Sequence, residues 1–178
     1  MSEPSPDPLL DHLAAGRPEA FAALYDRFGQ RLYRAAWGML GRREDAEDAV
    51  QDVFAAVVRS RDRLEDVEDM TAYLFTALRR AAGRLANRRA KAPAVSDEAV
   101  RQAAARSDQG ETSGAHSTRL ERALEALPRE QREVIAMKID GELTFAQIAQ
   151  AMDVSINTAA SRYRYALEKL RASLEGGS

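Results

Sequence analysis

The sequence predicts an all-α protein made of two small helical domains joined by a flexible linker. Apolar residues recur at helical spacing in almost every segment, and no stretch alternates between apolar and polar residues as a half-buried strand would. Around residues 92–115, Pro, Gly and Ser replace the large apolar side chains, which is typical of a linker. We therefore expect a first domain at residues 8–92, the linker at 93–116 and a second domain at 117–174.

The first domain is expected to contain three long helices around one core. Pro18 lies in the first turn of a helix that runs to Leu40, and Gly41 ends it. A second helix runs from about residue 44 to 59, and a third from about 71 to 89. Each carries an apolar stripe. The residues of the first helix predicted to face the core are Phe21, Leu24, Tyr25, Phe28, Leu32, Ala36 and Leu40, joined by Trp37.

Residues 143–169 predict a helix-turn-helix. Thr144 and Gln147 have the spacing of a capping box that starts a short helix, and Asp153 suits the left-handed backbone of a turn. Ser155 caps the next helix. The outer face of that helix is small, polar or basic, and its members are Asn157, Thr158, Ser161, Arg162, Arg164 and Tyr165. Such a face fits a DNA major groove. On this segment alone, an ordinary hairpin with a solvated outer face remains the alternative.

Charges of opposite sign are separated along the chain, although the net charge is only −2. Residues 1–70 carry 9 basic and 15 acidic residues, whereas residues 71–95 carry six basic residues and no acidic one. The acidic face of the second helix is either solvated or a docking surface for a basic partner. In the third helix, aromatic residues precede a ladder of arginines, which favours nucleic acid over a simple complement to the helix dipole.

The residue pattern indicates neither catalysis nor a metal site. The chain has no cysteine, and its two histidines, His12 and His116, fall in predicted loops. We find no nucleophile paired with a base and no phosphate-binding glycine loop, so we expect no cofactor and no enzymatic activity. The N-terminus is acidic and broken by prolines, unlike a signal peptide, and no apolar run is long enough to cross a membrane. We therefore expect a cytoplasmic protein without a membrane partner.

Four stretches resemble, in the expected order, the extracytoplasmic-function (ECF) class of the bacterial sigma-70 family. They read AFAALYDRFGQRLYRAA, EDAEDAVQDVF, TAYLFTALRRAAGRLANRR and ALEALPREQREVIAMKIDGELTFAQIAQAMDVSINTAASRYRYALEKL. The resemblance implies a specificity subunit of RNA polymerase, with no catalysis of its own. Such a subunit recognises the −10 and −35 elements of promoter DNA and helps to open the strands.

The resemblance also implies three groups of binding residues and a further candidate partner, an anti-sigma factor. The clamp helices of the largest polymerase subunit are expected to bind Asp45, Glu47, Asp48, Gln51 and Asp52. The −10 element is expected to bind Tyr73, Arg79, Arg80, Arg84, Arg88 and Arg89. The −35 element is expected to bind Ser155, Asn157, Thr158, Ser161, Arg162, Arg164 and Tyr165.

The chain departs from the usual pattern of that family at several positions. Tyr73, Arg80 and Gly83 stand where Trp, Asn and Asp are usual, Gln147 replaces an acidic residue and Ala160 a basic one. Two rival interpretations stay open. One is a free-standing helix-turn-helix regulator of transcription, and the other is a sigma-like decoy that occupies polymerase without opening promoters.

Overall fold

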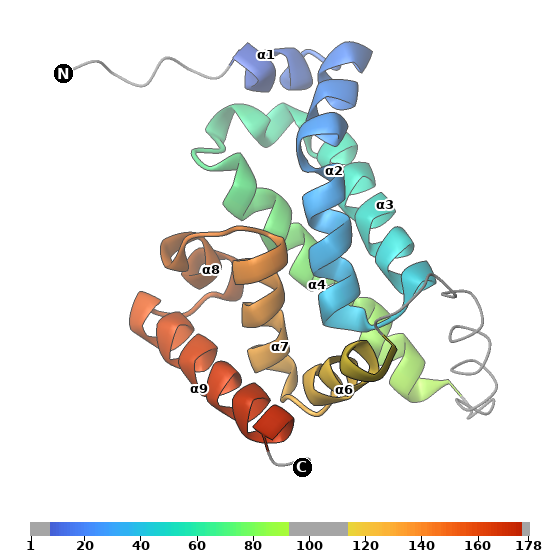
Figure 1. The fold of residues 1–178 in the computed structure, drawn as a ribbon. Helices are drawn as coiled ribbons and strands as arrows, with labels where there is room; N and C mark the ends of the chain where they lie inside the picture. Colours follow the sequence, from blue (N-terminus) through green and yellow to red (C-terminus); the bar gives the residue numbers. More distant parts are fainter. Residues whose placement is uncertain (1–7, 93–113, 176–178) are drawn as a thin grey trace.

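The all-helical prediction is confirmed by a computed structural model, which describes residues 8–92 and 114–175, and the side chains of the second range from residue 119 onward (Figure 1). Residues 93–113 of the predicted linker lie outside the described residues, and residues 114–116 form the start of a helix. Below, residues 8–92 are the N-terminal half and residues 114–175 the C-terminal half. No helix in these two ranges is long and apolar enough to cross a membrane.

The N-terminal half contains four α-helices and a short 3-10 helix. They are α1 (Pro8–Ala14), α2 (Pro18–Leu40), α3 (Arg43–Arg59), η1 (Arg61–Asp66) and α4 (Met70–Lys91). As predicted, Pro18 opens α2, and Gly41 ends it with a φ of 68°, a left-handed conformation that glycine adopts at little cost. The carboxylate of Asp69 begins α4 by accepting a hydrogen bond from the N–H of Ala72 at 3.0 Å. Neither α1 nor η1 was predicted from the sequence.

The C-terminal half contains the predicted helix-turn-helix. Its elements are α6 (Gly114–Glu125), α7 (Arg129–Ile135), the π-helical turn η2 (Ala136–Asp140), α8 (Phe145–Met152) and α9 (Ile156–Glu175). The Thr144–Gln147 capping box forms at the start of α8, and Asp153 adopts a φ of 55° in the turn. The hydroxyl of Ser155 accepts a hydrogen bond from the N–H of Thr158 at 3.0 Å and so caps α9. These predicted end signals are confirmed.

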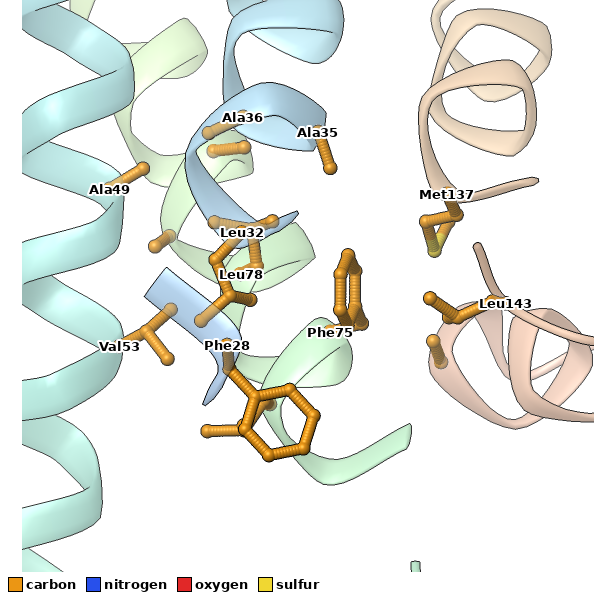
Figure 2. Close-up of a cluster of buried hydrophobic side chains, with 14 of the residues drawn as sticks. Phe28, Leu32, Ala35, Ala36, Ala49, Val53, Phe75, Leu78, Met137 and Leu143 are labelled. Atoms are coloured by element: carbon orange, nitrogen blue, oxygen red, sulfur yellow. The ribbon is translucent and has the colours of Figure 1, made fainter. Parts of the chain in front are cut away.

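The two halves share one hydrophobic core. Leu32, Leu78 and Val53 bring α2, α4 and α3 together, and Figure 2 shows Phe75 on the side of α4 that faces Met137 and Leu143 of the C-terminal half. All six side chains are almost fully buried. A smaller cluster of buried residues joins α6, α7 and α9. Because buried apolar contacts continue from one half into the other, the two predicted domains are packed together rather than held apart.

Two aromatic side chains of α2 and both histidines differ from the prediction. Tyr25 and Trp37 were expected in the core, yet 57% and 44% of their respective surfaces are exposed. Each ring instead packs against one neighbouring ring, Tyr25 against Phe54 and Trp37 against Tyr33, and keeps its polar group within reach of solvent. The two histidines lie in helices rather than loops, His12 in α1 and His116 in α6.

Candidate protein and nucleic-acid interfaces

The acidic residues of α3 divide into two groups. Asp48, Glu47 and Gln51 are exposed, and Glu47 is bonded to Arg43 at 2.9 Å, which raises the pKa of that guanidinium further above its usual value. Asp45 and Asp52 instead lie half-buried on the side of α3 that faces α4. The exposed group is therefore available to a partner from outside.

Asp45 and Asp52 pair with arginines of α4. Asp52 lies 3.3 Å from Arg84, and Asp45 lies 3.7 Å from Arg89, in both cases between carboxylate and guanidinium atoms. Two of the five predicted polymerase residues thus contact two of the predicted −10 residues. Because these pairs lie near the surface, they add little stability by themselves.

A groove between α2 and α3, which the sequence analysis missed, adjoins the exposed acidic group. It has a volume of about 720 Å³, and Tyr25, Tyr33 and Phe54 line it together with Glu47 and Gln51. The rings of Tyr25 and Phe54 pack with centroids 5.1 Å apart. The available signal was the spacing of Tyr25, Gly29 and Tyr33 on one side of α2, with a small residue between two rings. Tyr25 also fits the apolar stripe of α2, which is why the sequence predicts it in the core.

The arginine ladder of α4 faces two directions. Arg80, Arg84 and Arg88 follow one another at four-residue spacing and are exposed, whereas Tyr73 is half-buried. Arg79 lies on a different stripe of the helix and faces the C-terminal half. The structure therefore brings three of the six predicted −10 residues to one exposed row and separates Arg79 from it.

Arg79 contacts a buried carboxylate of α7. Glu133 is only 2% exposed, and its two oxygens accept hydrogen bonds from the Nε atoms of Arg79 and Arg129, each at 2.8 Å. A buried charge is costly unless it is paired and hydrogen-bonded, and here both oxygens are satisfied. One turn further along α4, a Cβ atom on Gly83 would lie 2.5 Å from Nη2 of Arg129, so glycine leaves room for that guanidinium.

The outward face of α9 carries most of the residues predicted to read the −35 element. The exposed members are Ser155, Asn157, Thr158, Arg164 and Tyr165, and Ser161 is half-exposed. The guanidinium of Arg164 lies over the ring of Tyr165, 5.3 Å from its centroid. Arg162 differs from this group because its guanidinium pairs with the carboxylate of Glu130 at 2.8 Å and its side chain is only 24% exposed.

Comparisons with known proteins match both described parts of the chain. The family models for sigma-70 region 2 and sigma-70 region 4 match residues 24–92 and 117–170. The ECF RNA polymerase sigma factor SigK of Mycobacterium ulcerans is 28% identical over 174 residues, which cover 94% of this chain and 92% of that protein. SigK of Mycobacterium tuberculosis H37Rv is also 28% identical, over 95% of this chain and 93% of the relative.

Solved structures give the same result for the fold. CnrH, in complex with the cytosolic domain of CnrY, matches with a TM-score of 0.69 and 26% identity, over 96% of this chain and 97% of that one. The sigma factor RpoE from Bartonella quintana, in complex with the anti-sigma factor NepR, matches with a TM-score of 0.69 and 20% identity. The match covers 90% of this chain and 99% of that one. The chain belongs to the ECF class of the sigma-70 family of RNA polymerase sigma factors.

Proposed function

We propose that this chain directs RNA polymerase to promoters in the cytoplasm, where it recognises the −10 and −35 elements and helps to open the strands. Polymerase supplies the catalysis. The observation that carries the proposal is the exposed polar face of α9, which follows a capped helix and a left-handed turn on the same chain as the acidic α3 and basic α4. We assign polymerase binding and −10 recognition to residues 8–92, and −35 recognition to residues 117–174.

The proposed polymerase contact is the exposed acidic group of α3, with the clamp helices of the largest subunit as its partner. Asp48, Glu47 and Gln51 supply negative and polar groups beside an aromatic groove. A basic, amphipathic helix would satisfy both the charges and the apolar walls. A regulatory anti-sigma factor is a second proposed partner, since the sigma factor RpoE from Bartonella quintana was solved in complex with the anti-sigma factor NepR.

The proposed DNA contacts have different roles. Arg80, Arg84 and Arg88 form an exposed row on α4 whose spacing suits phosphates or unpaired bases of the −10 element. Capture of an unstacked base would offset the few kcal/mol that unstacking costs. The residues of α9 would read base edges of the −35 element in the major groove, where one well-placed arginine contributes about 1–3 kcal/mol of discrimination.

Run-off transcription with purified core polymerase tests the proposal. We expect transcripts from a subset of a promoter-fragment library only when this chain is added. A free-standing regulator would bind its operator without polymerase, and a decoy would bind polymerase without producing transcripts. Binding to core polymerase without any chain-dependent transcript would therefore contradict the proposed function.

A further inference from the structure

A stripe of polar side chains runs along the outward surface of α9. Asn157, Ser161 and Arg164 follow one another at spacings of four and three residues, so they lie on one side of the helix. Asn157 and Arg164 are exposed, and Ser161 is half-exposed. The first two side chains are short and the third is long. This order fits a helix whose N-terminal turns lie deepest in a major groove, because a residue one turn further along needs a longer side chain to reach the base edges.

Arg164 differs from the other two arginines of α9. Arg162 and Arg171 each pair with a carboxylate, at 2.8 and 3.8 Å respectively. Arg164 makes no ion pair with any residue that the structure describes, and its guanidinium lies over the ring of Tyr165, 5.3 Å from the centroid. An aromatic ring, and not an acid, therefore positions this arginine.

The contact with Tyr165 leaves the hydrogen-bonding groups of Arg164 for a ligand. A guanidinium over an aromatic ring is held by its charge and its flat surface, so none of its N–H donors is used. The ring of Tyr165 has only two side-chain torsions and is itself 51% exposed, which makes it a stiff support at the surface. Because a free arginine loses much rotamer freedom when it binds, a supported one binds at a smaller entropic cost.

The charge beyond Arg164 limits the part of the stripe that faces DNA. Glu168 is the next residue on this side of α9 and is exposed, and the phosphates on both sides of a groove would repel its carboxylate. The Cα–Cβ bond of a helical residue tilts towards the N-terminus of its helix. Arg164 therefore leans away from Glu168, towards the turns that carry Asn157 and Ser161 and that enter the groove in the proposed complex.

We propose that Arg164 reads a guanine of the −35 element, and that Tyr165 is a positioning residue that holds the guanidinium in place. The inference rests on the proposed function and adds to it the base and the role of the ring. In the major groove, guanine presents two neighbouring acceptors, N7 and O6, which match two parallel N–H donors of a guanidinium. Adenine presents one acceptor and one donor there, and cytosine a donor, so neither offers the same pair. Tyr165 acts through Arg164 and contacts no base.

Selection from randomised promoters tests the base assignment. The starting fragment is a promoter that the chain transcribes in the run-off assay, with the bases of its −35 element randomised. Complexes of the chain with core polymerase retain part of this pool, and the retained fragments are sequenced. We expect wild type to select guanine at one position, and Arg164→Ala to lose that preference while it keeps the others. A variant that weakens binding to every sequence equally would indicate a phosphate contact and overturn the assignment.

Two substitutions of Tyr165 test the positioning role. Tyr165→Phe keeps the ring, whereas Tyr165→Leu keeps apolar bulk and helix propensity without a ring. We expect the phenylalanine variant to select guanine as wild type does, and the leucine variant to lose most of that preference. In an Arg164→Ala background, Tyr165→Leu should cause no further loss, because the two side chains act as one unit. Equal effects of Phe and Leu, or a further loss in the double variant, would overturn the positioning role.

A modified base tests the contact at the level of one atom. Replacing the selected guanine with 7-deazaguanine removes the N7 acceptor and leaves base pairing intact. We expect wild type in complex with polymerase to bind this fragment about tenfold more weakly, since one of two hydrogen bonds to a charged group is lost. Arg164→Ala should bind both fragments equally. The same replacement at a guanine outside the −35 and −10 elements is the control. Equal affinity of wild type for both fragments would overturn the contact.

These outcomes separate the inference from the proposed function. If no promoter is transcribed in a chain-dependent way, or if wild type selects no base in the −35 element, the proposed function fails and the inference fails with it. If wild type selects a −35 sequence that Arg164→Ala selects equally well, the proposed function stands and only the assignment of Arg164 and Tyr165 is overturned.

Discussion

Gly141 is tightly enclosed at the contact between the two halves. A Cβ atom there would lie 2.6 Å from Cε1 of Phe75 and 2.7 Å from the carbonyl oxygen of Met137. Its φ is −81°, so the requirement for glycine comes from close packing and not from backbone conformation. Small-to-large changes at such a site force neighbouring groups apart.

Gly141→Ala should therefore destabilise the protein by about 1–3 kcal/mol, the usual cost of overpacking. Gly29→Ala provides the contrast, because its added methyl meets only the exposed ring of Tyr25, at 3.3 Å, and alanine favours a helix interior by up to ~1 kcal/mol. Urea unfolding of both variants measures the difference. Equal free energies of unfolding for the two variants would argue against close packing at Gly141.

The single residue Asp140 makes the stability of the protein depend on pH. Burial raises the pKa of its carboxyl above the usual 3.8, and the nearby Arg34 only partly opposes the shift. The folded state therefore holds this proton to higher pH than the unfolded state does. As pH rises from 3.8 through the raised pKa, this group lowers the free energy of unfolding, and above that range the loss is constant.

Asp140→Asn removes the buried charge and should make the protein more stable than wild type at pH 7. At pH 4 and below, where the wild-type carboxyl also becomes neutral, the difference should shrink towards zero. Urea unfolding at both pH values measures it. A difference in the free energy of unfolding that is the same at both pH values would contradict the expected effect of burial. A wild type more stable than the variant at pH 7 would show that the interaction with Arg34 outweighs the cost of burial.

At the scale of elements, α3 separates residues that a linear motif treats as one group. The helix repeat places Asp45 and Asp52 towards α4, where they pair with arginines, and leaves Asp48 and Gln51 exposed. Removing one of the exposed side chains breaks no contact with α4, whereas removing Asp52 also frees Arg84. Only the exposed residues can report on polymerase binding without a structural effect.

The variant Asp48→Ala/Gln51→Ala should bind core polymerase about tenfold more weakly, equivalent to about 1.4 kcal/mol. The variant Asp62→Ala/Gln150→Ala removes the same two side-chain types from exposed positions on η1 and α8 and serves as the matched control. Titration of labelled polymerase with each variant measures the affinities. Equal affinities for the two double variants would place the polymerase contact elsewhere.

Helix α9 makes a similar distinction between two arginines. Arg164 is exposed over Tyr165, whereas Arg162 pairs with Glu130 of α7. Arg164→Ala should weaken binding to a −35 fragment by about 1–3 kcal/mol and lower its discrimination between sequences. Arg162→Ala should mainly affect the α7–α9 contact, and so stability more than specificity. Fluorescence anisotropy with cognate and scrambled duplexes separates the effects, and a larger loss of specificity from Arg162→Ala would reverse the assignment.

At the scale of the whole molecule, the sequence was sufficient for features that neighbouring residues determine. The end signals at Pro18, Gly41, Thr144 and Ser155 act within one helical turn, which is why the helices and the helix-turn-helix could be predicted. The acidic and basic helices were predicted for the same reason, since the side chains of a helix repeat regularly around it.

The relation between the halves could not be predicted in this way. Arg79 and Glu133 are 54 residues apart, and Arg31 and Gly141 are 110 apart, so no local pattern links the members of either pair. Periodicity assigns a residue to a side of its own helix but does not say which element covers that side. This is why Arg79 was grouped with the exposed arginines, and why Tyr25 was assigned to the core although it borders a groove.

The shared core around Phe75 has a thermodynamic consequence. Because the same buried cluster contains residues from both halves, loss of either half would expose apolar surface on the other, and the two should melt in a single cooperative transition. Anything that binds only α3 while the two halves are packed together would then also raise the melting temperature of α8 and α9. Calorimetry of the intact chain should show one heat-absorption peak rather than two.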